Sequence, residues 1–112
     1  MSQITTHVLD TSQGIPAEGI VVNLLELVDN QWNEISSSST SRDGRISDFL
    51  DSAKLLNPGH YRLDFKLEQY FTDQGIPCFY PEASVIFIVS SSDHYHIPLL
   101  LSPFGYSTYR GS

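Results

Sequence analysis

The segment HYRLDFKL (60–67) alternates between polar and apolar side chains over its whole length. In an extended chain successive side chains point to opposite faces, so a period of two predicts a strand with one buried and one solvated face. The polar positions hold a histidine, an arginine, an aspartate and a lysine, which are expected to face solvent. The residues expected in the core are Tyr61, Leu63, Phe65 and Leu67.

Segments of similar character flank this strand and are separated by turn signals. Asp43-Gly44 and Asn57-Pro58-Gly59 are turn sequences, and the Asp-Asn pair at 29–30 predicts a hairpin. Further strands are expected over 4–10, 19–28, 31–36, 83–90, 95–102 and 106–112, a short strand within 42–50, a surface turn over 36–41, and one or two helical turns over 68–75. Pro98 has no amide proton, so its strand is expected at a sheet edge or with a bulge there. Seven or eight short strands with one short helix predict an all-β sandwich.

The length and composition limit the possible classes of protein. The chain has 112 residues, which predicts a single domain over 1–112. Thirteen acidic residues against six basic ones give a net charge of −7, which disfavours nucleic acid or a membrane surface as a partner. The longest apolar stretches, such as VIFIV (85–89), are too short to cross a bilayer, and the first ten residues lack a signal-peptide pattern. A single cysteine, Cys78, excludes an intrachain disulfide. We expect a cytoplasmic protein.

Four histidines and one arginine are the candidates for chemistry. His94 and His96 share one strand face, which suits two metal ligands, but no third ligand at a suitable spacing completes a site, so no metal is expected. His7 lies within a strand and Arg45 follows the Asp-Gly turn; taken alone, each is most simply a structural or surface residue. His60 opens a polar strand face and is expected to be solvated. No serine–histidine–acid set or phosphate-binding glycine loop is present in the sequence.

Two segments carry a resemblance to a known family. ITTHVLDTSQGIPAEGIVVNL (4–24) and HYHIPLLLSPFGYSTYRGS (94–112) resemble the two signature regions of 5-hydroxyisourate hydrolase, the transthyretin-like enzyme family of urate breakdown. The resemblance continues through 40–46, 57–65 and 79–87, so it covers nearly the whole chain.

The resemblance implies a fold and an assembly. The fold is a transthyretin-like β-sandwich of two four-stranded sheets with one short helix. The assembly is a homotetramer, a dimer of dimers, with active sites in a channel between the dimers. Residues expected to face partner subunits include Leu99, Leu101, Phe104 and Tyr106.

The resemblance also implies a reaction, the ring-opening hydrolysis of 5-hydroxyisourate without a cofactor or metal. The implied catalytic residues are His7, Arg45, His96 and Ser112. The implied substrate-binding residues are His7, Arg45, Tyr109, Arg110, Gly111 and Ser112. Either imidazole, His7 or His96, fits the role of water-activating base, and we favour His7. Members of this family work in the cytoplasm, periplasm or peroxisome, so the sequence leaves the last two compartments open.

Two other readings stay open at this stage. A transthyretin-like carrier would bind thyroxine or another small aromatic ligand in the same channel, although histidines and an arginine there would be costly to bury against an apolar ligand. An adhesion-type sandwich would be monomeric and would tolerate substitution of every motif residue.

Overall fold

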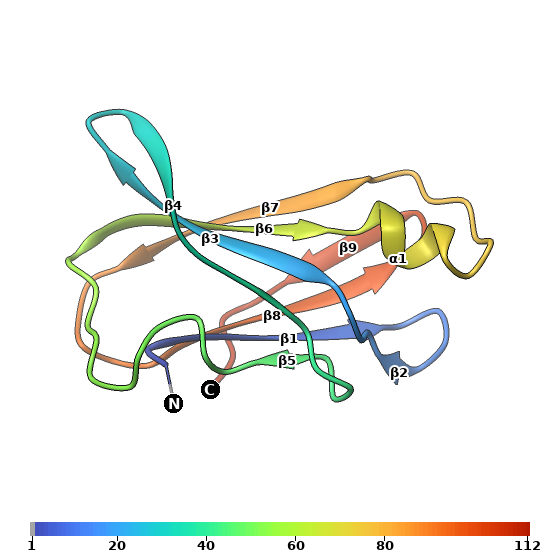
Figure 1. The fold of residues 1–112 in the computed structure, drawn as a ribbon, viewed down its shortest axis with the longest axis horizontal. Helices are drawn as coiled ribbons and strands as arrows, with labels where there is room; N and C mark the ends of the chain where they lie inside the picture. The colour runs from blue at the N-terminus through green and yellow to red at the C-terminus, as the bar shows by residue number, and fades with distance from the viewer. Residues whose placement is uncertain (1) are drawn as a thin grey trace.

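The computed structural model describes residues 2–112, which form a sandwich of two β-sheets (Figure 1). The alternating segment 60–67 forms the strand predicted for it, apart from Leu67, which follows the strand. The elements are β1 (Ile4–Asp10), β2 (Ile15–Pro16), β3 (Val21–Val28), β4 (Gln31–Ser39), β5 (Arg45–Ile46), β6 (Gly59–Lys66), α1 (Glu68–Thr72), β7 (Glu82–Val89), β8 (Tyr95–Ser102) and β9 (Gly105–Thr108).

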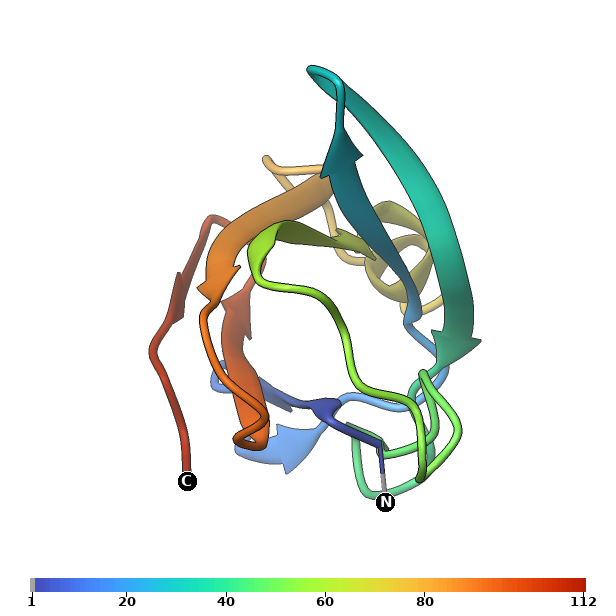
Figure 2. The ribbon, with the colours of Figure 1, turned by 90° about the vertical axis from the view of Figure 1, so that its left-hand side faces the viewer.

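The first sheet has the order β2-β1-β8-β9, and the second has the order β4-β3-β6-β7. The strand β5 adds a fifth member to the first sheet, because β2 and β5 pair with successive parts of β1. All strand pairs are antiparallel except β1 and β8, which run parallel. Viewed from one end, β9 lies beside β8 on one side of the sandwich and the β3–β4 hairpin extends on the other (Figure 2). The predicted fold class is confirmed, with β5 as an addition to the expected four strands.

The core lies between the sheets and follows the alternation of the sequence. Tyr61, Leu63 and Phe65 of β6 are buried as expected, and Leu67 is buried just beyond the strand. On the opposite face of β6, Asp64 is buried too, because its carboxylate accepts hydrogen bonds from the Arg62 guanidinium and the Ser84 hydroxyl. Fully buried partners from other strands are Ile4, Val8, Val22, Leu24, Leu99 and Leu101.

The expected surface turn over 36–41 is wrong in its first part. The strand β4 continues to Ser39 and pairs with β3 as far as Val21. A register shift opposite Leu24 and Leu25 accommodates one extra residue in β4, as in a β-bulge. Serine favours turns because its hydroxyl bonds to nearby backbone, but Ser36 donates instead to the distant Phe49 carbonyl at 2.6 Å. This strand is therefore held by contacts with residues distant in the sequence, and local sequence patterns do not indicate such contacts.

Pro98 is not in an edge strand, because β8 lies between β1 and β9. The ladder between β8 and β9 ends at Leu99 and Thr108, and a single bridge in the same register follows between His96 and Gly111. Pro98 lies in the gap between them, where a missing amide proton removes no ladder hydrogen bond, and its carbonyl accepts the Thr108 hydroxyl at 2.7 Å.

The prediction that four residues face partner subunits is wrong for two of them. Leu99 and Leu101 are fully buried in the core of their own chain. Phe104 and Tyr106 are exposed, by 69% and 40%. Within residues 2–112 no helix is long and apolar enough to cross a membrane.

Candidate functional site

Three strands bring the central polar residues together on the outer face of the first sheet. In β1, Ile4 and Val8 point into the core, so Thr5 and His7 point outwards. The short strand β5 places Arg45 directly opposite His7 in an antiparallel pair. The strand β8 places His96 opposite Thr5 in the parallel pair. His7, Arg45 and His96 therefore share one surface of the sheet.

The turn before β5 determines where Arg45 lies. Gly44 has a φ of 74°, in the left-handed region, and its carbonyl accepts the Val8 amide at 2.7 Å. A Cβ atom at this position would overlap the Val8 carbonyl oxygen. Glycine thus lets the turn approach β1 closely enough for Arg45 to pair with His7.

A threonine hydroxyl lies between two imidazoles in this site. Thr5 Oγ1 is 2.7 Å from His96 Nδ1 and 2.8 Å from His94 Nε2. The two rings are stacked, with centroids 6.2 Å apart and planes inclined by 26°. Thr5 is buried, His96 is partly buried and His94 is exposed, so the hydroxyl connects a solvent-facing ring with one that faces the groove.

A groove of about 310 Å³ opens over these groups. The residues that line it are Thr5, Thr6, Arg45, Ile46, Ser47, His94, His96 and Ser112. The Thr6 hydroxyl is used elsewhere, on the Ile97 carbonyl. His7 is paired with Arg45 in the sheet but is not among the lining residues. The volume of the groove is at the lower end of the range for small-molecule sites, which suits a small ligand better than a large one.

The last residues of the chain reach the groove along His96. The Gly111 amide donates to the His96 carbonyl at 2.9 Å. A Cβ atom at Gly111 would lie 2.6 Å from His96 Cδ2 and 3.1 Å from Pro98 Cγ, so only glycine allows this approach without displacing the ring. Ser112 follows directly and lines the groove.

Tyr109 and Arg110 lie elsewhere. They line a separate cavity of about 320 Å³ beside β7 and β8, together with apolar residues such as Ile86. The Arg110 guanidinium carbon lies 4.5 Å from the centre of the Tyr95 ring, a cation–π contact. His96 borders both cavities. The structure thus brings together His7, Arg45, His96, Gly111 and Ser112, and places Tyr109 and Arg110 around a neighbouring cavity.

Electrostatics favour the neutral form of both imidazoles. Burial lowers the pKa of His7, and the Arg45 guanidinium lowers it further, against an opposing effect of Asp43. Burial also lowers the pKa of His96, with further lowering by His94, Arg45 and His7, against an opposing effect of the Thr5 backbone. Both rings are therefore largely uncharged at neutral pH, as a general base must be.

A metal site needs several acidic, histidine or cysteine side chains close together. Across the described range 2–112, no three or more of these residues cluster in a way that would hold one. The histidine pair considered above as two metal ligands, His94 and His96, instead shares the Thr5 hydroxyl.

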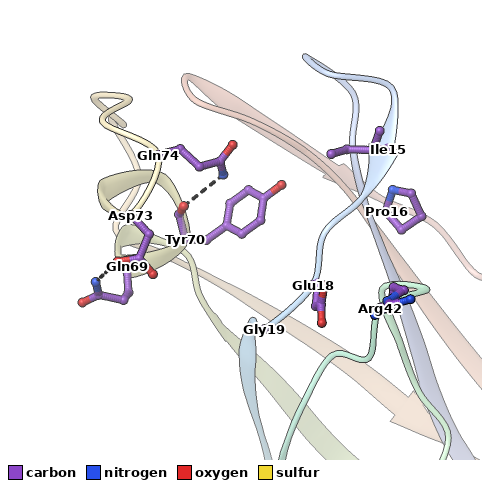
Figure 3. A pocket seen from close by; sticks show the side chains of 9 residues that line it. All are labelled: Ile15, Pro16, Glu18, Gly19, Arg42, Gln69, Tyr70, Asp73 and Gln74. Atoms are coloured by element: carbon purple, nitrogen blue, oxygen red, sulfur yellow. Dashed lines mark hydrogen bonds between the residues drawn. The ribbon is translucent and has the colours of Figure 1, made fainter.

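A larger cavity, of about 510 Å³, lies between the α1 region and the segment formed by β2 and the residues that follow it (Figure 3). Tyr70, Gln74, Glu18 and Arg42 contribute to its lining, and the Gln74 amide donates to the Tyr70 carbonyl at 3.0 Å. None of the residues expected to be functional lines it. Size alone therefore does not identify the site.

Sequence reasoning missed Thr5 and His94 as members of the site. The alternation within 4–10 does place Thr5 on the same face as His7, which was a usable signal. The contact between Thr5 and the two histidines depends on the parallel pairing of β1 with β8, and no local pattern indicates that pairing.

The sequence matches the HIUase/Transthyretin family over residues 4–111. The chain is 45% identical to 5-hydroxyisourate hydrolase of Mus musculus, over 99% of this chain and 96% of that protein. It is 46% identical to 5-hydroxyisourate hydrolase of Salmonella typhimurium, over 97% of this chain and 80% of that protein.

Solved structures show the same relationship. The structure of Klebsiella pneumoniae 5-hydroxyisourate hydrolase has a TM-score of 0.84 and 37% identity, covering 97% of this chain and 98% of that chain. Sea bream transthyretin in complex with thyroxine has a TM-score of 0.91 and 29% identity, covering 98% and 95%. The backbone is thus similar to both proteins, and the sequence is more similar to the hydrolase. On this agreement of sequence and fold, the chain belongs to the HIUase/Transthyretin family.

Proposed function

We propose that this chain hydrolyses 5-hydroxyisourate to 2-oxo-4-hydroxy-4-carboxy-5-ureidoimidazoline. Similarity to curated hydrolases along nearly the full chain supports the reaction. The observation that carries the proposal is the pairing of two imidazoles of lowered pKa, His7 and His96, with the Arg45 guanidinium on one sheet face beside a small groove. A carrier of large apolar ligands gains nothing from such a lining.

The chemistry assigns a different task to each group. His7, as the base, takes a proton from a water molecule while the water oxygen attacks the ring amide carbonyl. The resulting oxyanion faces the Arg45 guanidinium, whose planar donors stabilise the developing charge. When the carbon–nitrogen bond breaks, His7 returns its proton to the departing nitrogen. The former carbonyl carbon becomes a carboxylic acid, which releases the remaining proton of the water molecule to solvent and ionises to a carboxylate. His96 orients and polarises the substrate.

The residues at the end of the motif have supporting tasks in this proposal. Gly111 lets the backbone pass His96, and Ser112 orients the water or an imidazole from the edge of the groove. Tyr109 and Arg110 act from the adjoining cavity, by closing the pocket around His96 rather than by contacting the reacting bond.

The direct test follows the decay of freshly made 5-hydroxyisourate by ultraviolet absorbance. The purified chain should accelerate the decay well above the spontaneous rate, and NMR should identify the carboxylated ureidoimidazoline as the product. The His7→Asn/His96→Asn double variant, purified in the same way, controls for host hydrolase. A thyroxine titration in parallel tests the carrier alternative. Tight thyroxine binding with no accelerated decay would overturn the proposal in favour of that alternative.

The proposed assembly is a homotetramer. Exposed apolar side chains on β7 and around β9, Ile86, Ile88, Phe104 and Tyr106, support burial against other copies of the chain. Light scattering after size-exclusion chromatography should give four times the chain mass, and a monomer would contradict the assembly. The proposed compartment is the cytoplasm, since the single cysteine, Cys78, has no partner for an intrachain disulfide and suits a reducing environment.

A further inference from the structure

We propose that Thr5 is a positioning residue for His96, and that its single hydroxyl proton couples the tautomer of His96 to that of His94. The inference rests on the proposed function only for its effect on turnover, because the coupling itself is a property of the folded chain.

The geometry leaves few arrangements of protons. Thr5 Oγ1 lies within hydrogen-bond distance of His96 Nδ1 and His94 Nε2, and those are its side-chain contacts among residues 2–112. A hydroxyl donates one proton and accepts through its lone pairs, whereas each nitrogen of a neutral imidazole is either a donor or an acceptor. When the hydroxyl proton is used in one of these contacts, that nitrogen accepts from Thr5 and the other nitrogen must donate to the hydroxyl oxygen, because one proton cannot serve both.

The proton position on the Thr5 hydroxyl determines whether the second ring nitrogen of His96, Nε2, offers the groove a hydrogen-bond donor or an acceptor. Nε2 of His96 has no protein hydrogen bond in the described part of the chain, so it is the nitrogen available to a ligand. When His94 carries its proton on Nε2, the Thr5 hydroxyl donates to His96 Nδ1, and His96 presents an Nε2–H donor to the groove. When His94 Nε2 is bare, the Thr5 hydroxyl turns to it, and His96 presents a basic lone pair.

Charged and titratable groups on each neighbouring element act on the same ring. His7 on β1 and Arg45 on β5 face His96 and, like His94, lower its pKa. Tyr109 and Arg110 border the cavity on its other side. His94 is exposed, so its ring contacts solvent as well as the Thr5 hydroxyl. A His94 ring that is protonated on both nitrogens carries a proton on Nε2, and in that state the Thr5 hydroxyl donates to His96 Nδ1.

The adjoining threonine provides a matched control. Thr6 is equally buried, but its hydroxyl points to the other side of β1 and donates to the Ile97 carbonyl at 2.6 Å. Thr6→Val removes a buried hydroxyl from the same strand without touching either imidazole. An effect found in Thr5→Val and absent from Thr6→Val is therefore not a general cost of losing a buried hydroxyl.

The test uses long-range ¹H–¹⁵N NMR of the histidine rings as a function of pH. In the unsubstituted chain, His96 Nδ1 and His94 Nε2 should be in opposite states, one protonated and one bare. Thr5→Val should change the tautomer balance and the pKa of His96, while Thr5→Ser and Thr6→Val keep both. The pKa shifts of Thr5→Val and His94→Leu should be non-additive in the double variant.

Turnover gives a second readout. Thr5→Val should lower kcat about tenfold with little change in KM, because the ring loses its orientation while the groove keeps its shape. Thr5→Ser should restore most of the rate. Unchanged His96 signals in Thr5→Val, or additive shifts in the double variant, would overturn the proposal. If Thr5→Val does not fold, His94→Leu, an exposed substitution, must still alter the His96 tautomer balance, and no change there would overturn it too. Because the NMR arm needs no substrate, it separates a failed coupling from a failed assignment of the reaction.

Discussion

The backbone of Gly111 lies against the imidazole of His96, and the Gly111 amide donates to the His96 carbonyl at 2.9 Å. No side chain fits between them, since a Cβ atom at position 111 would lie 2.6 Å from His96 Cδ2. One glycine thus determines both the path of the last residues and the position of a proposed catalytic ring.

Gly111→Ala should lower kcat/KM for 5-hydroxyisourate by about 100-fold, because the added methyl group displaces His96 from its working position. The fold should be kept, since Gly111 is outside the core. The matched control is Gly105→Ala in β9, where the nearest atom to a new Cβ is 3.7 Å away, an ordinary contact. Steady-state assays with circular dichroism measure both properties. Equal rates for the two variants would refute the steric argument.

His7→Asn, His96→Asn and Arg45→Ala should each lower kcat by about two orders of magnitude, as the loss of acid–base or oxyanion assistance commonly does. His60→Asn is the control, because His60 is an exposed histidine on β6 of the other sheet. Ultraviolet assays of these four variants and the unsubstituted chain at matched concentration make the comparison. Activity near that of the unsubstituted chain in both histidine variants would remove the proposed mechanism.

The pH dependence follows from the lowered pKa of His7 and His96. A lowered pKa keeps each ring neutral, and so able to act as a base, to pH values below the ordinary pKa of about 6.5. A plot of kcat/KM against pH should therefore be level near neutrality and should fall only below that value. Arg45→Lys keeps the positive charge, so the pH at which kcat/KM begins to fall should be unchanged even if the rate itself is lower. A profile that rises on acidification would contradict a histidine base.

The hydrogen bond from Tyr70 to Asp10 should contribute measurably to stability. Asp10 is fully buried at the end of β1 and accepts the Tyr70 hydroxyl at 2.8 Å, together with groups of Ser12 and Gln13. Burial alone would raise the pKa of Asp10, but the hydrogen bonds from Ser12, Tyr70 and Gln13 lower it overall. Burial and the Asp10 carboxylate raise the pKa of Tyr70 to about 12.

Tyr70→Phe should lower the free energy of unfolding by about 1.5–3 kcal/mol at pH 7, the range for a hydrogen bond to a charged group. Since the folded-state pKa of Asp10 is lowered, its stabilising effect is full above the unfolded pKa of about 3.9 and is lost as the pH falls through the lower folded value. Urea unfolding at fixed protein concentration should thus show a smaller difference at strongly acidic pH. Tyr80→Phe, at a 40% exposed tyrosine, is the control. A difference that grows on acidification would show that Asp10 is not the partner that matters.

The sequence predicted the parts of the fold that depend on local patterns. The alternation around Leu63 predicted β6 and its buried face, since side-chain period and burial are set by the strand itself. The prediction for Ser36 failed because its hydroxyl has a partner 13 residues away, at Phe49. Leu99 was expected to face another subunit, but it is buried against the second sheet of its own chain. The apolar sequence of a strand does not indicate whether its side chains pack within the chain or against another subunit.

The same limit applies to the site. The motif residues His7, Arg45 and His96 were identified by resemblance, and the structure places them on one sheet face. Thr5 belongs to the same face of β1, but nothing in its neighbours indicates two histidines about 90 positions later. Tyr109 was expected in the same pocket, yet the unpaired stretch opposite Pro98 leaves it beside the neighbouring cavity.

The parallel pairing of β1 with β8 has a consequence for how the protein folds during its synthesis. Thr5 and His96 are 91 positions apart in the chain, and every contact between these two strands closes a loop of similar length. Such contacts have a high contact order and form late. Closing the long loop costs conformational entropy before the contact contributes any stabilising free energy. The groove therefore has no early, local precursor, and a ribosome-bound chain ending before β8 holds His7 and Arg45 without the ring that completes the site.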